Sequence, residues 1–144
     1  MSLGRKNNLA LQAVVYINNF IGKPYIWGGD DPVRGFDCSG LAIEMLQSVG
    51  ILPKTFDDTA AALFMIYFDK GIKKPEPGSL VFFGKDIDHI THVGIAVDEN
   101  LMIEAGGGGQ NVKSSDDAAK FNAYVRMRPI KSRADYLACC DPFM

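Results

Sequence analysis

The hydrophobic pattern of the chain changes once, near Gly71, and this change limits the folds that the chain can adopt. Before Gly71, apolar residues recur at the spacing of helices, whereas after Gly71 they gather in short runs typical of strands. Helices followed by a series of strands, without regular alternation of the two, indicate an α+β fold. We therefore expect N-terminal helices packed on an antiparallel sheet, with residues 1–144 forming a single domain.

The limits of these elements follow from the apolar runs and from the turn residues between them. Three helices are expected, at residues 8–21, 38–49 and 56–69, the last with early caps at residues 57–59. Four strands are expected, at residues 79–83, 91–97, 101–105 and 123–127. The inward-facing residues expected in the third helix are Ala61, Ala62, Met65 and Phe68. The four glycines at residues 106–109 are expected to form a flexible loop.

The charge balance argues against several classes of partner. The chain has 15 basic and 17 acidic residues, a net charge of −2 and no basic run, so we expect no nucleic-acid partner. No segment approaches the roughly 20 apolar residues that span a bilayer, and the polar residues 1–8 do not resemble a signal peptide. The glycine run lacks the Lys-Ser/Thr of a phosphate-binding loop, so no nucleotide is expected. We expect no cofactor, and the sequence predicts no oligomeric state.

The tetrapeptide Asp37-Cys38-Ser39-Gly40 lies where a glycine-rich segment gives way to the second helix. A cysteine in the first turn of a helix is close to the positive end of the helix dipole, which favours the thiolate. The thiolate is the nucleophilic form, so Cys38 is a candidate catalytic nucleophile. A small buried side chain that only packs is the alternative interpretation.

The other cysteines and a polar loop carry side chains that can bind metal ions. Cys139 and Cys140 are adjacent, and without a second pair they do not make a zinc site. We expect them to pack or to be exposed thiols. Asp86, Asp88 and His89 offer oxygen and imidazole ligands, but a hydrated loop is the favoured interpretation. We expect no metal.

His92 provides the second chemical group. Alternation along its strand puts Val93 and Ile95 on one face and His92 with Gly94 on the other. The small Gly94 leaves room for another backbone beside the imidazole, and the N-terminus of the Cys38 helix is expected to occupy it. The alternative is a histidine in the core or at the surface whose hydrogen bonds have only a structural role.

Glu104 follows His92 across a predicted hairpin. A three-residue turn at residues 98–100 pairs Gly94 with Glu104, and this puts Glu104 diagonal to His92 on the same face. Asn100 tolerates the left-handed conformation that such a turn favours. Glu104 would then hold the imidazole in one tautomer and stabilise the imidazolium, as the third member of a Cys-His-acid set. A solvated carboxylate on an edge strand is the alternative.

Four blocks of sequence, taken together, resemble the NlpC-type cysteine peptidases of bacterial cell walls. They are residues 24–29 (PYIWGG), 36–41 (FDCSGL), 77–83 (PGSLVFF) and 91–97 (THVGIAV), within a resemblance that covers residues 8–128. The resemblance implies a papain-like fold with the nucleophile at a helix N-terminus. It also implies endopeptidase or amidase action on peptidoglycan stem peptides, often between D-glutamate and a diamino acid.

The same resemblance implies catalytic roles for three residues. Cys38 matches the nucleophile of the family and His92 matches its general base. Glu104 falls at the third, orienting position, which is commonly histidine, so the orienting group here is expected to be acidic. In the last step, water would hydrolyse the thioester of the acyl-enzyme and release the acyl group.

Substrate-binding roles are implied for three further residues. Tyr25 matches an aromatic hydroxyl beside the nucleophile, and Asp37 with Ser39 matches positions that contact the free amine of the stem peptide in several members. Residues 56–59 (FDDT) depart from the Ser- and Gln-rich segment usual in the family, so the substrate pocket is expected to differ there.

Two other functions remain open at this stage. An inactive module would keep the pocket only to bind a peptide or glycan, and fast iodoacetamide labelling of Cys38 would argue against it. An acyl or amide transferase would use the same three residues, and only the identity of the acceptor separates it from a hydrolase. A hydrolase of this kind would act on the cell wall, outside the cytoplasm or after delivery by a phage or a secretion system.

Overall fold

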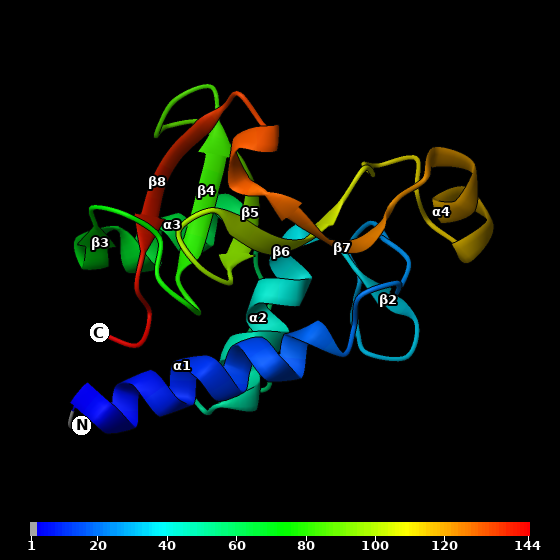
Figure 1. Cartoon of the computed structure of the whole chain (residues 1–144). Helices are drawn as coiled ribbons and strands as arrows, with labels where there is room; N and C mark the ends of the chain where they lie inside the picture. The colour runs from blue at the N-terminus through cyan, green and yellow to red at the C-terminus, as the bar shows by residue number, and fades with distance from the viewer. Residues whose placement is uncertain (1–2) are drawn as a thin grey trace.

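A computed structural model, drawn in Figure 1, describes residues 3–144. The described residues form a six-stranded antiparallel sheet in the order β3-β8-β4-β5-β6-β7. Helices α2 and α3 pack on β5 at one face of this sheet, and α1 packs against α2 (Figure 1). The expected α+β fold, with N-terminal helices on an antiparallel sheet, is confirmed.

The helices within residues 3–144 are α1 (Leu3–Asn18), α2 (Cys38–Ser48), α3 (Ala60–Tyr67) and α4 (Ser115–Phe121), with single 3-10 turns η1 (Phe68–Lys70) and η2 (Ile130–Ser132). The strands of the large sheet are β3 (Gly71–Ile72), β4 (Leu80–Gly84), β5 (Ile90–Ala96), β6 (Leu101–Gly106), β7 (Tyr124–Pro129) and β8 (Tyr136–Cys140). Strands β1 (Asp30–Asp31) and β2 (Gly35–Phe36) pair with each other apart from that sheet.

The first two helices lie close to their expected positions. Helix α1 begins several residues before the expected start and ends at Asn18, and its buried residues are Ala10, Ala13 and Ile17. Helix α2 matches its expected bounds to one residue, because Gly50, at φ +78°, provides the left-handed stop. No helix within residues 3–144 is both long enough and apolar enough to cross a bilayer.

The third helix differs from expectation in its start and in its buried face. Thr59 is the cap, and its side chain accepts a hydrogen bond from the Ala62 amide at 3.2 Å. A helix that begins at Ala60 buries Ala60, Leu63 and Tyr67. The expected inward face was therefore wrong: Ala61, Met65 and Phe68 are exposed and Ala62 is only partly buried. The phase of a helix depends on its first residue, and this start was placed four residues too early.

The sheet contains the four expected strands and further elements that the sequence analysis missed. Strand β8 runs between β3 and β4 in the sheet, and it carries Cys139 and Cys140, which are buried and pack in the core. The apolar run from Tyr136 to Cys140 was the signal for this strand. Helix α4 was missed as well, although Ser114 caps it by accepting from the Asp117 amide at 3.1 Å.

The hairpin between β5 and β6 has the expected register. Ile95 pairs with Ile103 and Ala96 with Met102, as a three-residue turn requires. Asn100 is not left-handed, however, because Asn122 is the only non-glycine residue with positive φ in the described chain. The Asp98 carboxylate closes the turn instead, by accepting the amides of residues 100 and 101 at 2.8 Å each.

The two faces of the sheet bury two separate clusters. Val93 and Ile95 belong to the large cluster that includes the buried residues of α1, α2 and α3. The opposite face holds a smaller cluster made of Val81, Phe83, Ala96, Met102, Ile130 and Cys139. The expectation that the N-terminus of α2 fills the room beside Gly94 was wrong. A Cβ at Gly94 would lie 2.7 Å from the Met102 sulfur, so a side chain from β6 fills that space.

Candidate active site

Cys38 is the first residue of α2, and the residues around it hold that position. The Asp37 side chain caps the helix by accepting a hydrogen bond from the Gly40 amide at 2.7 Å. A side chain at Gly40 would collide with the carbonyl oxygen of Gly29, which accepts the Asp37 amide at 3.0 Å. The motif therefore puts a partly buried thiol at the positive end of α2.

Asp37 is tied into the protein through both of its carboxylate oxygens. Its Oδ2 accepts the Gly28 amide at 3.1 Å, and its Oδ1 also accepts the Ser39 hydroxyl at 3.3 Å. Burial raises the pKa of Asp37, and these hydrogen bonds only partly oppose the rise. Each carboxylate oxygen can accept more than one hydrogen bond, so Asp37 retains acceptor capacity toward the cleft that it lines.

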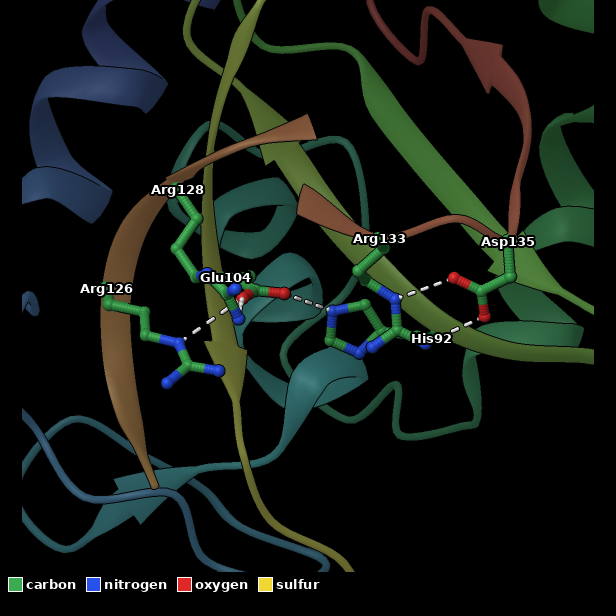
Figure 2. A network of polar contacts seen from close by, with 6 residues as sticks. All are labelled: His92, Glu104, Arg126, Arg128, Arg133 and Asp135. Carbon is green, nitrogen blue, oxygen red and sulfur yellow. Dashed lines mark hydrogen bonds and ion pairs between the residues drawn. The ribbon is translucent and has the colours of Figure 1, made fainter. Parts of the chain in front are cut away.

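His92 extends from β5 and is 6% exposed. Its Nε2 lies 2.6 Å from Oε1 of Glu104 (Figure 2), and its ring packs on Phe83 with 5.5 Å between centroids. With Nε2 bonded to Glu104, the nitrogen left for the Cys38 thiol is Nδ1. Burial alone lowers the pKa of His92, but hydrogen bonds to Cys38 and Glu104 outweigh it and raise that pKa to about 9. The imidazole is therefore in its charged, doubly protonated form at neutral pH.

Glu104 is almost completely buried, at 1% exposure, on β6. Two arginines from the adjacent strand β7 approach its Oε2, Arg126 at 3.4 Å and Arg128 at 3.7 Å (Figure 2). Burial acts to raise the pKa of Glu104, but the bond to His92 and the three neighbouring positive charges reverse this and lower it. The carboxylate is thus ionised and held on two sides, by an imidazole and by arginines.

Tyr25 and the glycine run form another wall of the site. Tyr25 is buried, and its pKa is raised by that burial and by the negative charges of Cys38 and Asp37, so its hydroxyl remains a donor. A side chain at Gly108 would collide with the Tyr25 ring, and one at Gly106 would lie 2.8 Å from the Glu104 carboxylate. The glycines permit this close approach, a reason that the sequence analysis did not foresee when it assigned them flexibility.

Two cavities meet at Cys38 and share Tyr25, Trp27 and Thr91 in their walls. The larger, of about 610 Å³, extends over the start of α3 and is also lined by Asp37, Ser39, Asp57 and Asp58. The smaller, of about 200 Å³, is also lined by His92, the four glycines and Arg133. The thiol thus lies in a cleft with an acidic side and a basic side.

Five of the six residues singled out from the sequence line this cleft: Tyr25, Asp37, Cys38, Ser39 and His92. The sixth, Glu104, lies behind His92 and is hydrogen-bonded to it. Trp27 and Arg133 also line the cleft, and neither was predicted from the sequence. Trp27 is half exposed and follows Tyr25 in the aromatic block, which was an available signal. Arg133 had none, because no motif surrounds it.

The other histidine lies outside this arrangement. His89 is exposed and its Nδ1 lies 2.7 Å from Oδ1 of Asp86, within the loop between β4 and β5. The described residues contain no group of three histidine, cysteine or acidic side chains placed to hold a metal ion. The pair at residues 86 and 89 is therefore an exposed histidine–aspartate hydrogen bond in a turn.

Comparisons with known proteins agree with the fold. The model of the NlpC/P60 family matches residues 22–129. The bifunctional muramidase/DL-endopeptidase CwlT of Bacillus subtilis is 41% identical over 91 residues, which are 61% of this chain and 26% of that protein. The probable endopeptidase YafL of Escherichia coli is 28% identical over 127 residues, which are 84% of this chain and 49% of that protein. The chain spans less than half the length of these relatives.

Solved structures show the same fold at low sequence identity. An NlpC/P60 family protein from Bacillus cereus superposes with a TM-score of 0.70 at 21% identity, over 93% of this chain and 40% of that one. The P60 domain of antigen MAP1204 from Mycobacterium avium subspecies paratuberculosis gives 0.66 at 20% identity, over 96% and 98% of the two chains. The papain-like fold expected from the sequence is thereby confirmed.

Proposed function

The chain belongs to the NlpC/P60 family, and we propose that it hydrolyses an amide bond in the stem peptides of peptidoglycan, with Cys38 as the nucleophile. One observation carries the proposal most directly. Nε2 of His92 is hydrogen-bonded to a buried carboxylate, which leaves Nδ1 for the thiol at the start of α2. This is the arrangement that nucleophilic catalysis by a cysteine requires.

In the first half of the reaction, His92 holds the proton and Cys38 acts as the thiolate. The sulfur attacks the carbonyl carbon of the substrate, and the oxyanion that forms is stabilised by the Cys38 backbone amide and the Tyr25 hydroxyl. The C–N bond then breaks, and His92 gives its proton to the leaving amine. The products of this half are a free amine and a thioester on Cys38.

In the second half, neutral His92 removes a proton from water, which attacks the thioester and releases a carboxylic acid. Glu104 keeps Nε2 of the imidazole protonated throughout, so that Nδ1 does the proton transfer. The bond to His92, together with Arg126 and Arg128, holds the Glu104 carboxylate ionised, so it stabilises the imidazolium in both halves.

The bond proposed as the target joins D-glutamate to the diamino acid of the stem. The acidic side of the cleft, with Asp37 and Ser39, suits the free amine at the start of a stem peptide. Relatives named as peptidoglycan endopeptidases support the substrate class, among them LytE of Bacillus subtilis and the murein DD-endopeptidase MepH of Escherichia coli. The place of action would be the cell wall.

The proposed catalytic unit is residues 1–144 as one domain. Support comes from the larger buried cluster, which includes residues from Ala10 in α1 to Phe143 near the C-terminus. The site residues themselves come from α2, β5 and β6, and the walls of the cleft come from the segments around them.

Digestion of purified sacculi tests the proposal. The wild-type protein should release fragments whose masses and new amino ends identify the cut bond, whereas the Cys38→Ala variant should release none. Release of the same fragments by the alanine variant would refute the nucleophile. A binding module would bind sacculi but cut nothing and would label slowly with iodoacetamide, and a transferase would need an added amine to form its product.

A further inference from the structure

Arg133 lies beside the proposed catalytic histidine, in a segment that carries no motif. It follows η2 and precedes β8, and it lines the smaller cavity together with Cys38 and His92. Its side chain is 32% exposed, so the guanidinium can be reached from the cleft. None of the catalytic steps derived above uses this residue.

The guanidinium of Arg133 is held in a fixed orientation. Its Nε and Nη2 donate to the two oxygens of Asp135 at 3.0 and 2.9 Å, a paired contact that defines the plane of the group. Its carbon lies 5.1 Å from the centre of the Phe83 ring, and the same ring packs on His92. Arg133 and His92 are thus positioned against one common aromatic side chain.

One edge of this guanidinium has no partner within residues 3–144. An arginine has five N–H donors, and Asp135 takes one on Nε and one on Nη2. The two donors on Nη1 and the second donor on Nη2 remain, and together they make an edge that matches a second carboxylate. Asp135 lies on the side of Arg133 away from Glu104 (Figure 2).

The two sides of the cleft therefore carry opposite charge. Asp37, Asp57 and Asp58 line the larger cavity, whereas His92 and Arg133 line the smaller one. His92 delivers a proton to the leaving nitrogen, so the leaving part of a substrate must lie on the His92 side of the sulfur. That is the side of Arg133.

We propose that Arg133 binds a carboxylate carried by the residue whose amine is released, and so selects stem peptides with a negatively charged group next to the cut bond. This inference rests on the proposed function and adds a specificity residue to it. In diaminopimelate the carboxylate is either the α-carboxylate or the one at the end of the side chain. A lysine at the same place has no side-chain carboxylate.

Three synthetic peptides separate these sources. Each is L-Ala-γ-D-Glu-diaminopimelate, the first with both carboxylates of the diamino acid free, the second amidated at the α-carboxylate and the third amidated at the side chain. Wild-type kcat/KM should fall about tenfold for one amide, as expected for the loss of a charge-assisted hydrogen bond at a partly exposed site. The other amide should stay within about twofold, which identifies the bound group. Equal rates on all three peptides would overturn the proposal.

The Arg133→Gln variant should lose this discrimination, so that the free and amidated peptides react at similar and lower rates. Lys131→Gln removes an exposed positive charge two residues away in η2 and should keep the wild-type ratio. Arg133→Lys keeps the charge without the fork and should keep a preference of about threefold. Thermal unfolding and iodoacetamide labelling of Cys38 report whether each variant retains its fold and site.

The ratio between free and amidated peptides is the deciding readout, because a purely structural loss would lower both rates alike. Arg133→Gln with the full wild-type ratio refutes the role of Arg133 while leaving the peptidase proposal intact. If Arg133→Gln does not fold, an unchanged ratio in Arg133→Lys refutes the claim that the forked guanidinium of Arg133 binds the carboxylate. If the wild-type protein cuts none of the peptides and no sacculi, the proposed function fails and the inference fails with it.

Discussion

Two histidine–carboxylate pairs with nearly equal contact distances lie in different parts of the molecule. His92 and Glu104 are 2.6 Å apart, and His89 and Asp86 are 2.7 Å apart. The side chains of the first pair are 8% and 1% exposed, and those of the second are 64% and 49% exposed. Both pairs raise the pKa of their histidine. Distance alone therefore does not distinguish a site from a surface pair.

The difference lies in what surrounds each pair. His92 has a thiol on one nitrogen and a carboxylate on the other, and that carboxylate is itself held by two arginines. Among the described residues, the side chains that raise the pKa of His89 are two aspartates of its own loop, Asp86 and Asp88. Burial removes competing water, so each contact of His92 is stronger and more specific than its counterpart at His89.

Removal of the thiol tests the feature that the His89 pair lacks altogether. Cys38→Ala should lower kcat/KM by about 10⁵-fold or more, because the covalent route is lost. Peptide cleavage followed by mass spectrometry measures this. Cys139→Ala removes a buried thiol outside the cleft and should leave the rate within about threefold. A large loss in the Cys139 variant with an intact fold would contradict the assignment of Cys38.

Replacing each histidine separately by asparagine compares the two pairs directly. His92→Asn should lower kcat/KM by about a thousandfold, since general acid–base catalysis contributes 10²–10⁴-fold. His89→Asn, a matched change at an exposed site, should leave kcat/KM within about twofold. Similar losses in the two variants would mean that the buried pair has no special part in the reaction.

Titration followed by NMR compares the same rings without activity. The His92 ring should titrate with a midpoint near pH 9, above the ordinary value of 6.5, because the charged form is favoured by Cys38 and Glu104. His92 therefore stays protonated as the pH rises through neutrality, and it loses its proton only near pH 9. At 1 M salt the shift of His89 should shrink while that of His92 persists, since buried pairs are screened less. A His92 midpoint at or below 6.5 would contradict the ion-pair mechanism.

Neutralising the carboxylates should have a smaller effect than removing the rings. Glu104→Gln should lower kcat/KM by about tenfold, less than the loss in His92→Asn, because orientation and charge support are affected while the ring remains. Asp86→Asn should change the rate by less than twofold. A loss at Glu104 equal to that at His92 would show that Glu104 has a role beyond orientation.

The arginine behind Glu104 should give the smallest effect. Arg126→Gln removes one of two positive charges next to the carboxylate, and Arg126 is partly exposed, so we expect a two- to fivefold decrease in kcat/KM. The acid limb of the pH–rate profile should move to higher pH, because the pKa of Glu104 rises when a neighbouring positive charge is lost. An unchanged acid limb would show that Arg126 does not influence the pKa of Glu104.

Several parts of the site could be predicted from the sequence because the signals are local. The Asp37 cap, the thiol at residue 38 and Gly40 lie within one turn of a helix, and the length of a short turn sets the register that brings Glu104 to His92. Tyr25, Asp37 and Ser39 were singled out by resemblance to the family, and their positions at the cleft agree with it. Their roles stay predictions until the variants are measured.

Other parts were decided by contacts between distant segments. The buried face of α3 depended on which residue began the helix, and Met102, not a helix end, filled the space at Gly94. Arg126 reaches Glu104 across 22 positions because β7 pairs with β6, and Arg133 enters the cleft because β8 is inserted between β3 and β4.

The sequence by itself thus predicted the position of Cys38, the proposed nucleophile, at the start of a helix, and the strand that carries His92, its proposed base. Only the tertiary structure decided what holds the acid and which charges line the two sides of the cleft. The physical reason is that hydrogen-bonded turns and helix caps are set by neighbouring residues, whereas side-chain charge pairs depend on strand order, which local patterns do not encode.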